Sequence, residues 1–561
     1  MDIFETQDLT FSYPQVQVAA LEKISVSIPQ GSFVLLCGPS GGGKTTFLKL
    51  LKPELTPHGV RTGKVIYAHE EIDGLDQKRS ASEIGFVMQD PESQIVTDEV
   101  WHELAFGLEN LGMPSEEIRL RVGEMAHYFG ISSWYHQKTA TLSGGQKQML
   151  NLASVMVMGP KVLLLDEPTA QLDPIAAEQF IGTLSKLNKD FGITIILSEH
   201  RLEEIFHFVD YVMVLEEGRC VAFDSPRNVC KMLSGKPVFA GFPAAARTYA
   251  ALGKDDSDYP VSVREGRQWL SEEIEKQRLI PSGAEANSRT LSEEIALELK
   301  NVWFRYERFS QDIMSGTDAR IRKGTVTAIL GGNGAGKTTA LLVMAGLLKP
   351  YRGQVKWFGT PIDKYRSGDK HRRFVSMLPQ NPSLVFVKDT VMDDFKLMLN
   401  DTGNGKDKDQ QIRQISEEFG LEASILTRNP ADLSGGELQK CALAKICLGN
   451  PKILLVDEPT KGLDAFFKKQ LKELLIKKAK EDGLTVIMVT HDVEFAAEAA
   501  DQCMLAFDGE LLAPGTPETF FTRNRFYTTA AARLAADLVP ESVTVEQIVG
   551  RLKRAGGLAD G

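Results

Sequence analysis

Short, continuous apolar runs recur along the chain and alternate with longer stretches whose apolar residues follow a helical period. The runs at residues 162–165, 193–197, 453–456 and 485–489 consist mainly of Leu, Ile, Val and Met. Runs of this length without polar alternation are typical of parallel strands buried on both faces. Residues 176–187, between two of these runs, have the spacing of an amphipathic helix. The pattern predicts α/β architecture, with parallel strands joined by right-handed helical crossovers.

Two further patterns occur once in each half of the chain. Residues 3–13 and 296–306 combine alternation with β-branched and aromatic side chains, which predicts antiparallel strands. Residues 93–135 and 389–426 have a mainly helical pattern. We therefore expect each half to hold an antiparallel β subdomain and a helical subdomain beside its parallel sheet.

A glycine-rich turn separates the apolar run 32–37 from the helix-compatible run 46–51. The turn reads Gly38-Pro39-Ser40-Gly41-Gly42-Gly43-Lys44-Thr45, which is the P-loop pattern. A phosphate needs several converging backbone N–H groups, and only a chain with little side-chain bulk can supply them. Lys44 adds a full positive charge for the β- and γ-phosphates, and the Thr45 hydroxyl can ligate Mg2+.

The same turn occurs again after the apolar run 326–330, as Gly331-Gly332-Asn333-Gly334-Ala335-Gly336-Lys337-Thr338. Further landmarks recur in the same order at an offset of 291 positions. They are residues 142–146 with 433–437, residues 162–169 with 453–460, Gln89 with Gln380, and His200 with His491. A constant order and spacing indicate a duplicated nucleotide-binding domain, with two tandem P-loop domains.

Paired acidic residues end one apolar run in each half, as Asp166-Glu167 and Asp457-Glu458. A carboxylate at the C-terminal end of a parallel strand lies where it can hold Mg2+ through its water shell. The glutamate that follows can orient and deprotonate the attacking water. The pairs therefore predict phosphoryl-transfer chemistry.

A second anion-binding helix end is predicted in each half, at Leu142-Ser143-Gly144-Gly145-Gln146 and at Leu433-Ser434-Gly435-Gly436-Glu437. Ser143 is a good N-cap for a helix over 146–156, and the two glycines let a phosphate approach the exposed N–H groups. Each half already has a P-loop. Two cradles per half suggest that the halves close face to face, each completing the site of the other.

These motifs resemble those of ATP-binding cassette (ABC) ATPases, over nearly the whole chain and in both halves. The resemblance implies ATP and Mg2+ as ligands, adenine stacking on Tyr13 and Tyr306, and phosphate contacts that reach Thr46 and Thr339. The implied nucleotide-binding residues are Tyr13, Gly38, Pro39, Ser40, Gly41, Gly42, Gly43, Lys44, Thr45, Thr46, Ser143, Gly145 and Gln146, with Tyr306, Gly331, Gly332, Asn333, Gly334, Ala335, Gly336, Lys337, Thr338, Thr339, Ser434, Gly436 and Glu437. The implied catalytic residues are Glu167, Glu458, His200, His491, Gln89 and Gln380. The implied Mg2+ contacts are Thr45, Gln89, Asp166, Thr338, Gln380 and Asp457.

The family also implies two composite sites within one chain, an intramolecular cassette dimer. The first would combine Lys44, Gln89, Glu167 and His200 with Ser434, and the second Lys337, Gln380, Glu458 and His491 with Ser143. Neither half lacks a catalytic residue type, so we expect both sites to hydrolyse ATP.

The segment after Gln89 reads Gln89-Asp90-Pro91-Glu92-Ser93-Gln94 and is similar to that of the cassette subunits of energy-coupling factor (ECF) importers. In that group the segment forms the groove for a coupling helix of a shared transmembrane subunit. The second half departs from the pattern, with Val385 where the second glutamine would stand. The resemblance implies membrane partners, a shared transmembrane coupling protein and a substrate-binding membrane protein. Because the two grooves are then not equivalent, they suit an asymmetric partner that offers two different coupling helices.

Three other functions stay open. A duplicated ATPase of another importer, such as a sugar system, is the nearer alternative, although one site of such proteins is often degenerate. A soluble ABC protein that acts on ribosomes would carry a long, basic linker, and a repair-type ABC ATPase would carry zinc-binding cysteines. Neither feature is present in this sequence.

Composition and charge disfavour several classes of partner and of metal or disulfide site. The formal net charge of −11 disfavours a general nucleic-acid partner. No run reaches the roughly 18 apolar residues that cross a bilayer, so we expect no direct membrane insertion and a peripheral place on the cytoplasmic side of the cell membrane. The six cysteines include no CxxC pair, which argues against a disulfide framework or a zinc site. Cys37 adjoins the first P-loop, so alkylation there would be expected to block nucleotide binding.

We expect five segments. They are a first ABC ATPase domain at 1–235, its helical appendix at 236–280, a linker at 281–294, a second ABC ATPase domain at 295–516 and its helical appendix at 517–561. The appendices are inferred from a weak repeat between residues 244–270 and 530–552.

Overall fold

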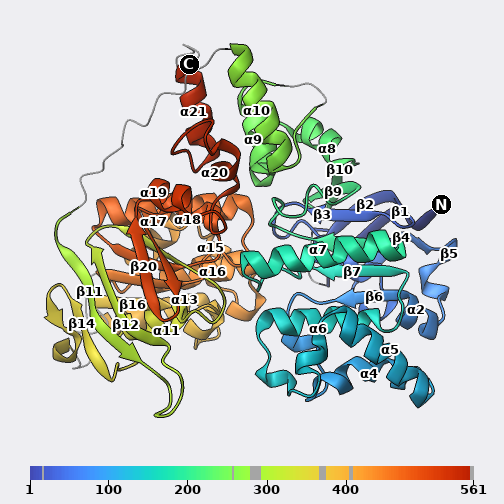
Figure 1. Ribbon diagram of the computed structural model, residues 1–561, viewed down its shortest axis with the longest axis horizontal. Helices are drawn as coiled ribbons and strands as arrows, with labels where there is room; N and C mark the ends of the chain where they lie inside the picture. Colours follow the sequence, from blue (N-terminus) through green and yellow to red (C-terminus); the bar gives the residue numbers. More distant parts are fainter. Residues whose placement is uncertain (15–17, 255–257, 278–291, 366–373, 403–407, 556–561) are drawn as a thin grey trace. The chain divides into compact units, whose positions relative to one another are not determined.

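The computed structural model describes residues 1–14, 18–254, 258–277, 292–365, 374–402 and 408–555 (Figure 1). The chain divides into two compact units, Met1–Gly266 and Arg267–Gly561. Each unit contains a four-stranded antiparallel sheet and a six-stranded sheet that is mainly parallel. The structure therefore confirms two tandem α/β domains.

The six-stranded sheet of the first unit has the strand order β10-β9-β3-β8-β7-β6. Its strands are β3 (Phe33–Cys37), β6 (Ile84–Val87), β7 (Val162–Asp166), β8 (Thr194–Ser198), β9 (Tyr211–Glu216) and β10 (Arg219–Asp224). The edge strand β10 runs antiparallel to β9, and the other neighbours in the sheet are parallel. Every residue of β3, β7 and β8 is buried, as expected for strands that are covered on both faces.

The remaining elements of the first unit surround this sheet. The antiparallel sheet has the order β2-β1-β4-β5, with β1 (Asp2–Ser12), β2 (Leu21–Pro29), β4 (Val60–Tyr67) and β5 (Glu70–Glu71). The helices are α1 (Lys44–Leu50), α2 (Gln77–Glu83), α3 (Pro91–Gln94), α4 (Val100–Asn110), α5 (Ser115–Tyr128), α6 (Gly144–Met156), α7 (Pro174–Phe191), α8 (Pro226–Leu233) and α9 (Ala244–Ala251). The next helix, α10 (Val263–Gln277), contains the boundary between the two units.

The second unit repeats this plan. Its antiparallel sheet has the order β12-β11-β14-β15, with β11 (Ile295–Phe304), β12 (Met314–Arg322), β14 (Arg352–Trp357) and β15 (Thr360–Pro361). Its larger sheet has the order β16-β17-β18-β13-β19-β20, with β13 (Val326–Leu330), β16 (Val375–Leu378), β17 (Ile453–Asp457), β18 (Thr485–Val489), β19 (Gln502–Phe507) and β20 (Glu510–Gly515). The helices are α11 (Lys337–Met344), α13 (Val391–Thr402), α14 (Lys408–Glu418), α15 (Ala423–Leu426), α16 (Gly435–Cys447), α17 (Ala465–Glu481), α18 (Val493–Ala499), α19 (Pro517–Arg523), α20 (Ala530–Ala535) and α21 (Val545–Ala555).

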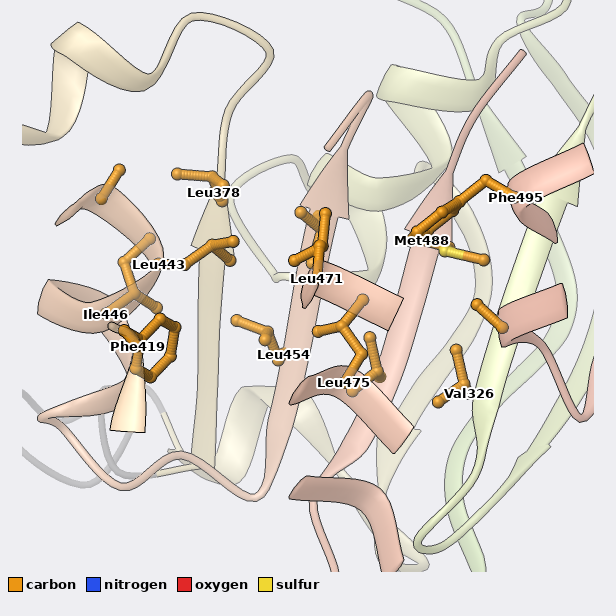
Figure 2. Packing of buried hydrophobic residues seen from close by; sticks show 14 of the residues in the cluster. Val326, Leu378, Phe419, Leu443, Ile446, Leu454, Leu471, Leu475, Met488 and Phe495 are labelled. Carbon is orange, nitrogen blue, oxygen red and sulfur yellow. The ribbon is translucent and has the colours of Figure 1, made fainter. Parts of the chain in front are cut away.

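The core of the second unit lies between its larger sheet and the helices that cover it (Figure 2). Leu454 of β17 and Met488 of β18 are fully buried in one cluster with Leu443 of α16 and Leu475 of α17. Removing such apolar surface from water stabilises the unit by about 25 cal/mol per Å². The helix that begins at the Ser434 motif is therefore part of the same core cluster as β17, the strand that ends in the acidic pair.

The strand order explains how distant motifs meet. Because β3, β8, β7 and β6 are neighbours, their C-terminal ends lie along one edge of the sheet. The P-loop follows β3, His200 follows β8, Glu167 follows β7 and Gln89 follows β6. This edge is where parallel α/β sheets bind their ligands.

The finer domain boundaries stay a prediction. The linker predicted at 281–294 lies mostly outside the described residues, which resume at 292. The segments expected to be appendices are helical, with α9 and α10 in the first and α20 and α21 in the second.

Candidate functional site

Each P-loop is shaped by glycines that no other residue could replace without strain. Gly38 and Gly43 have φ values of 134° and 97°. A Cβ atom on Gly38 would lie 2.0 Å from the carbonyl oxygen of Leu215. In the second unit, a Cβ atom on Gly331 would lie 2.5 Å from the carbonyl oxygen of Ala506. Only glycine permits this backbone path beside the neighbouring strand.

The lysine of each P-loop turns back over its own loop. The Nζ atom of Lys44 donates hydrogen bonds to the carbonyl oxygens of Gly38 and Pro39, both at 3.0 Å. The Nζ atom of Lys337 makes the same bonds to Gly331 and Gly332, at 2.9 and 2.8 Å. Both lysines are more than nine-tenths buried. Their charges are thus held at the loops, where a phosphate would be bound.

The next residue of each P-loop contacts the aspartate predicted to hold Mg2+. The Thr45 hydroxyl donates to Oδ1 of Asp166 at 3.0 Å, and the Thr338 hydroxyl donates to Oδ2 of Asp457 at 2.8 Å. Burial raises the pKa of Asp166, and hydrogen bonds from Ser198 and Thr45 partly offset the rise. Burial also raises the pKa of Asp457. A hydroxyl and a carboxylate are hard oxygen ligands of the kind that Mg2+ prefers, so the residues present fit this ion.

The glutamate after each aspartate has an unusual backbone. Glu167 and Glu458 have φ values of 43° and 51°, in the left-handed region. This conformation costs about 1–3 kcal/mol for a residue with a side chain and is concentrated at functional sites. The backbone N–H of Glu167 is held by the carbonyl oxygen of Ser198 at 3.1 Å. The strained turn directs the carboxylate away from the strand, toward His200.

In the first unit the structure brings Glu167, His200 and Gln89 together. His200 Nε2 lies 2.9 Å from Oε1 of Glu167, and Gln89 Nε2 donates to Oε2 of Glu167 at 2.9 Å. Burial by itself would raise the pKa of Glu167, but His200 and Lys44 hold it below its ordinary value. The carboxylate is thus ionised and oriented by two side chains, as a proton acceptor requires.

The second unit brings Glu458 and His491 together in a different way. His491 Nε2 lies 3.2 Å from Oε1 of Glu458, and the backbone N–H of His491 donates to Oε2 at 3.1 Å. Gln380 follows β16 and is exposed, as Gln89 is after β6. The two catalytic arrangements are therefore related but not identical.

The serine-led motifs form complete capping boxes. Ser143 Oγ accepts from the backbone N–H of Gln146 at 3.3 Å, and Gln146 Oε1 accepts from that of Ser143 at 2.9 Å. Glu437 takes the place of the glutamine at Ser434, with distances of 3.4 and 2.8 Å. The predicted N-caps are confirmed. Contacts of Ser143, Gly145, Gln146, Ser434, Gly436 and Glu437 with a nucleotide bound in the other unit stay a prediction.

Both predicted adenine-stacking tyrosines lie beside the P-loop helices. The Tyr13 hydroxyl is 3.0 Å from Oγ1 of Thr46, and the Tyr306 hydroxyl is 3.1 Å from Oγ1 of Thr339. Tyr306 is 60% exposed, so its ring can be covered by a base. The remaining predicted phosphate contacts lie in the two loops, at Ser40, Gly41, Gly42, Asn333, Gly334, Ala335 and Gly336.

Sequence reasoning missed several side chains that organise these sites. Ser198 donates to Oδ1 of Asp166 at 2.7 Å, and the buried Glu199 accepts from the Thr169 hydroxyl at 2.5 Å. A charged residue two positions after the apolar run 193–197 was the available signal. The structure also contradicts the expectation for Cys37, because the side chain is 1% exposed and burial raises its pKa to about 12. An alkylating reagent has no access to such a thiol.

Within the residues that the structure describes, no helix combines the length and apolar character needed to span a membrane. The same part of the chain contains no group of three or more His, Cys, Asp and Glu side chains placed to hold a metal ion.

Comparison with known proteins gives a consistent result. The family model described as "ABC transporter" matches residues 21–170 and 314–461. A "Putative ABC transporter ATP-binding protein" of Bacillus cereus (strain ATCC 10987 / NRS 248) is 41% identical over 545 residues, covering 97% of each chain. A "Putative HMP/thiamine import ATP-binding protein YkoD" of Bacillus subtilis (strain 168) is 30% identical over 535 residues, covering 93% of each chain.

Among solved structures, a complex of archaeal ribosomal stalk protein aP1 and archaeal ribosome recycling factor aABCE1 matches 92% of this chain and 91% of the matched chain. Its TM-score is 0.58 and its sequence identity 20%, a likeness that concerns the fold alone. The family match, by contrast, covers more than half of the chain and includes both P-loops and both acidic pairs. The chain therefore belongs to the ABC transporter family, as an ATP-binding and ATP-hydrolysing protein with two ABC ATPase domains.

Proposed function

We propose that this chain is the motor subunit of an ABC importer of the ECF type. The observation that carries the proposal is the way in which the segment after Gln89 is fixed. Gln94 accepts from the backbone N–H of Met88 at 2.8 Å and donates to the carbonyl oxygen of Phe86 at 3.1 Å. The second glutamine of the ECF-like sequence thus closes the segment onto β6. The similarity to a protein named for HMP/thiamine import supports the same class.

Two further groups hold this segment of the first unit. Glu103 of α4 accepts from the backbone N–H groups of Val96 and Thr97, at 3.1 and 2.8 Å. Asn151 of α6 donates to the carbonyl oxygen of Pro91 at 3.1 Å. Val96 remains 67% exposed beside these anchors. A rigid, partly apolar surface next to Gln89 is suited to transmit the movement of a partner helix.

The second unit anchors the equivalent segment differently. The buried Asp394 of α13 accepts from the backbone N–H groups of Val387 and Lys388. Lys445 of α16 donates to the carbonyl oxygen of Val385, the position where the second glutamine is missing. Leu384, which is 69% exposed, lies beside these anchors. Two unlike surfaces suit a transmembrane partner with two different coupling helices.

ATP would be held between the P-loop of one unit and the serine-led helix of the other. The site of the first P-loop uses Lys44, Gln89, Glu167, His200 and Ser434, and that of the second uses Lys337, Gln380, Glu458, His491 and Ser143. The lysines neutralise phosphate charge, and Glu167 and Glu458 take a proton from the attacking water. The histidines keep these carboxylates oriented through the contacts of 2.9 and 3.2 Å.

Mg2+ would be bound at Thr45 and Asp166, with Gln89, and at Thr338 and Asp457, with Gln380. When bound, the ion supplies charge neutralisation for the β- and γ-phosphates. The chain itself holds the hydroxyl and carboxylate oxygens within 3.0 Å of each other in both units.

We propose that the partners are a shared transmembrane coupling protein and a substrate-binding membrane protein, and that the chain lies at the cytoplasmic face of the membrane. The test of this assignment is affinity purification of the chain from detergent-solubilised membranes, with the Glu167→Gln and Glu458→Gln changes and ATP present. Integral membrane proteins should co-purify in fixed ratio. Sedimentation with ribosomes, and no membrane protein, would contradict the importer assignment.

The composite sites are tested by cross-linking in a chain whose six native cysteines are replaced. Ser143→Cys and Asn333→Cys should form an ATP-dependent disulfide when both glutamates are changed to glutamine. Ser143→Cys with Ser40→Cys, in the P-loop of its own unit, is the matched control and should not cross-link. A cross-link in the control alone would reject the proposed pairing.

A further inference from the structure

A buried carboxylate outside the proposed set of site residues distinguishes the two units. Glu199 directly follows β8 and precedes His200, and it is 3% exposed. Its Oε1 atom accepts from both the backbone N–H and the hydroxyl of Thr169, at 3.0 and 2.5 Å. Its Oε2 atom accepts from the backbone N–H of His200 at 3.2 Å. Both carboxylate oxygens are therefore engaged with neighbours of the catalytic glutamate.

The two partners of Glu199 both lie next to Glu167, Thr169 in the chain and His200 at its carboxylate. Thr169 belongs to the turn that follows Glu167, where the backbone N–H of Ala170 donates to the carbonyl oxygen of Glu167 at 3.2 Å. His200 contacts the carboxylate of Glu167 at 2.9 Å. The Glu199 side chain thus connects the turn that carries the base to the backbone of the histidine that orients it.

The second unit has no carboxylate at this position, because Thr490 precedes His491. The Thr490 hydroxyl accepts from the backbone N–H of Asp492 at 3.0 Å. The backbone N–H of His491 is instead bound by Oε2 of Glu458, at 3.1 Å. In the second unit, therefore, the catalytic glutamate itself accepts the hydrogen bond from the histidine backbone N–H. In the first unit, Glu199 accepts this hydrogen bond.

The consequence for the first unit is seen at Gln89. In this unit Glu199 binds the backbone N–H of His200, and Oε2 of Glu167 accepts from Gln89 Nε2 at 2.9 Å. The carboxylate of Glu167 is then held from two directions, by a residue after β8 and by a residue after β6. A hydrogen bond to a charged group is strong enough to change an equilibrium by about tenfold or more.

We propose that Glu199 is a positioning residue that links the catalytic glutamate of the first unit to Gln89. In its presence, Gln89 restrains Glu167. Without it, the oxygen of Glu167 turns to the backbone of His200, as Glu458 does toward His491, and the link to Gln89 is lost. Because Gln89 begins the segment proposed to face the membrane partner, hydrolysis in the first unit depends directly on the state of that segment. The inference rests on the proposed role of Glu167 as the base.

A double-mutant cycle tests the link in the full-length chain. Glu458→Gln is present throughout, so that ATP turnover reports the first unit. We compare Glu199→Thr, which introduces the residue of the second unit, with Gln89→Ala and with both changes together. Each single change should lower kcat by about tenfold, while KM for ATP changes by less than about twofold. The combined variant should be no slower than either single variant, because the same link is broken only once.

Independent effects of the two changes would contradict the proposal. If the two changes multiply, so that kcat falls by about a hundredfold, Glu199 and Gln89 act independently and the proposal is overturned. The matched control is Glu178→Thr, which removes an exposed carboxylate from α7 of the same unit. It should leave the tenfold effect of Gln89→Ala intact.

A second variant tests the proposal even if Glu199→Thr prevents folding. Glu199→Gln keeps the size of the side chain, but its amide can accept on one side only, so either Thr169 or His200 loses its acceptor. In this background the effect of Gln89→Ala should shrink to about threefold, and an undiminished tenfold effect would overturn the proposal. Failure of the proposed base role is distinguished by the chain with Glu167→Gln and Glu458→Gln. Parental turnover in that chain would reject both the base role and this inference.

Discussion

The ammonium group of Lys445 lies 2.6 Å from Oδ1 of Asp394, and both side chains are at least nine-tenths buried. The same ammonium group donates to the carbonyl oxygen of Val385. One ion pair therefore ties α16, whose N-cap is Ser434, to α13 and to the segment after Gln380. Removing one residue of a buried ion pair lowers the stability of the fold, because the remaining charge stays buried without a partner.

Lys445→Met should destabilise the second unit by about 3 kcal/mol, since Asp394 would stay buried without its cation. The measurement is denaturant unfolding followed by a probe in the second unit. Lys469→Met, which removes an exposed lysine from α17, is the control and should change stability by about 0.5 kcal/mol or less. Equal losses in the two variants would show that the pair has no special role.

Gln94→Val introduces the residue type that the second unit has at Val385. The change would leave the backbone N–H of Met88 and the carbonyl oxygen of Phe86 without their present partner. An unmade hydrogen bond in a partly buried place costs about 1–3 kcal/mol. We expect faster amide hydrogen exchange across residues 86–97, measured by mass spectrometry. Ser93→Ala, at an exposed position of the same segment, should produce a much smaller change.

Cys37 should resist alkylation over a wide pH range. Burial raises the pKa of its thiol to about 12, against an ordinary value of 9.0, so the reactive thiolate remains scarce as the pH rises from 7 to 9. We expect no iodoacetamide adduct on Cys37 in the native chain at either pH, and full modification after unfolding. A modification rate in the native chain that matches the rate in the unfolded chain would contradict the burial of this residue.

Glu167→Gln and Glu458→Gln should each remove the turnover of one site and leave nucleotide binding in place. A general base contributes about 10²–10⁴ in rate, so the chain with both changes should lose ATP hydrolysis by at least a hundredfold. Each single variant should lose a substantial part of the activity, because both sites have a complete set of residue types. Full activity in either single variant would exclude that glutamate from the reaction.

The motif residues could be predicted because their chemistry fixes both residue type and spacing. The glycines of 38–43, the lysines and the acidic pairs have few substitutes, and the buried strands are continuous apolar runs. The antiparallel edge strands β10 and β20 gave no such signal. They pair through short hairpins, and their residue types are as common in loops as in strands.

The partners of the site residues could not be predicted for a different reason. Thr169 and Glu199 are 30 positions apart, and Asp394 and Lys445 are 51 apart. Each of these residue types is common at the protein surface, and only the packing of strands and helices brings the pairs together. The left-handed backbone conformation of Glu167 could likewise not be predicted from its residue type, because glutamate rarely adopts this conformation.

Glu437 gives a last prediction, which depends on the proposed pairing of the two units. Its carboxylate accepts from the backbone N–H of the N-cap residue Ser434, as the Gln146 side chain does from Ser143. Unlike Gln146, it adds a negative charge at the N-terminal end of α16. Arg428 lies 3.6 Å away, and because this pair is partly exposed it compensates the charge weakly. If the γ-phosphate of ATP approaches Ser434, Glu437→Gln should tighten ATP binding by about two- to threefold at low salt.

Fluorescence titration with an ATP analogue measures this effect in the chain with both catalytic glutamates changed to glutamine. The gain should shrink at high salt, because a solution of about 1 M ionic strength screens charges beyond about 3 Å. The capping box should survive, since a glutamine oxygen accepts the same N–H of Ser434 as Gln146 does for Ser143. Gln146→Glu is the reciprocal variant and should weaken binding by a similar factor. Affinities that do not respond to either change at low salt would place the phosphates away from both serine-led helix ends and reject the proposed composite sites.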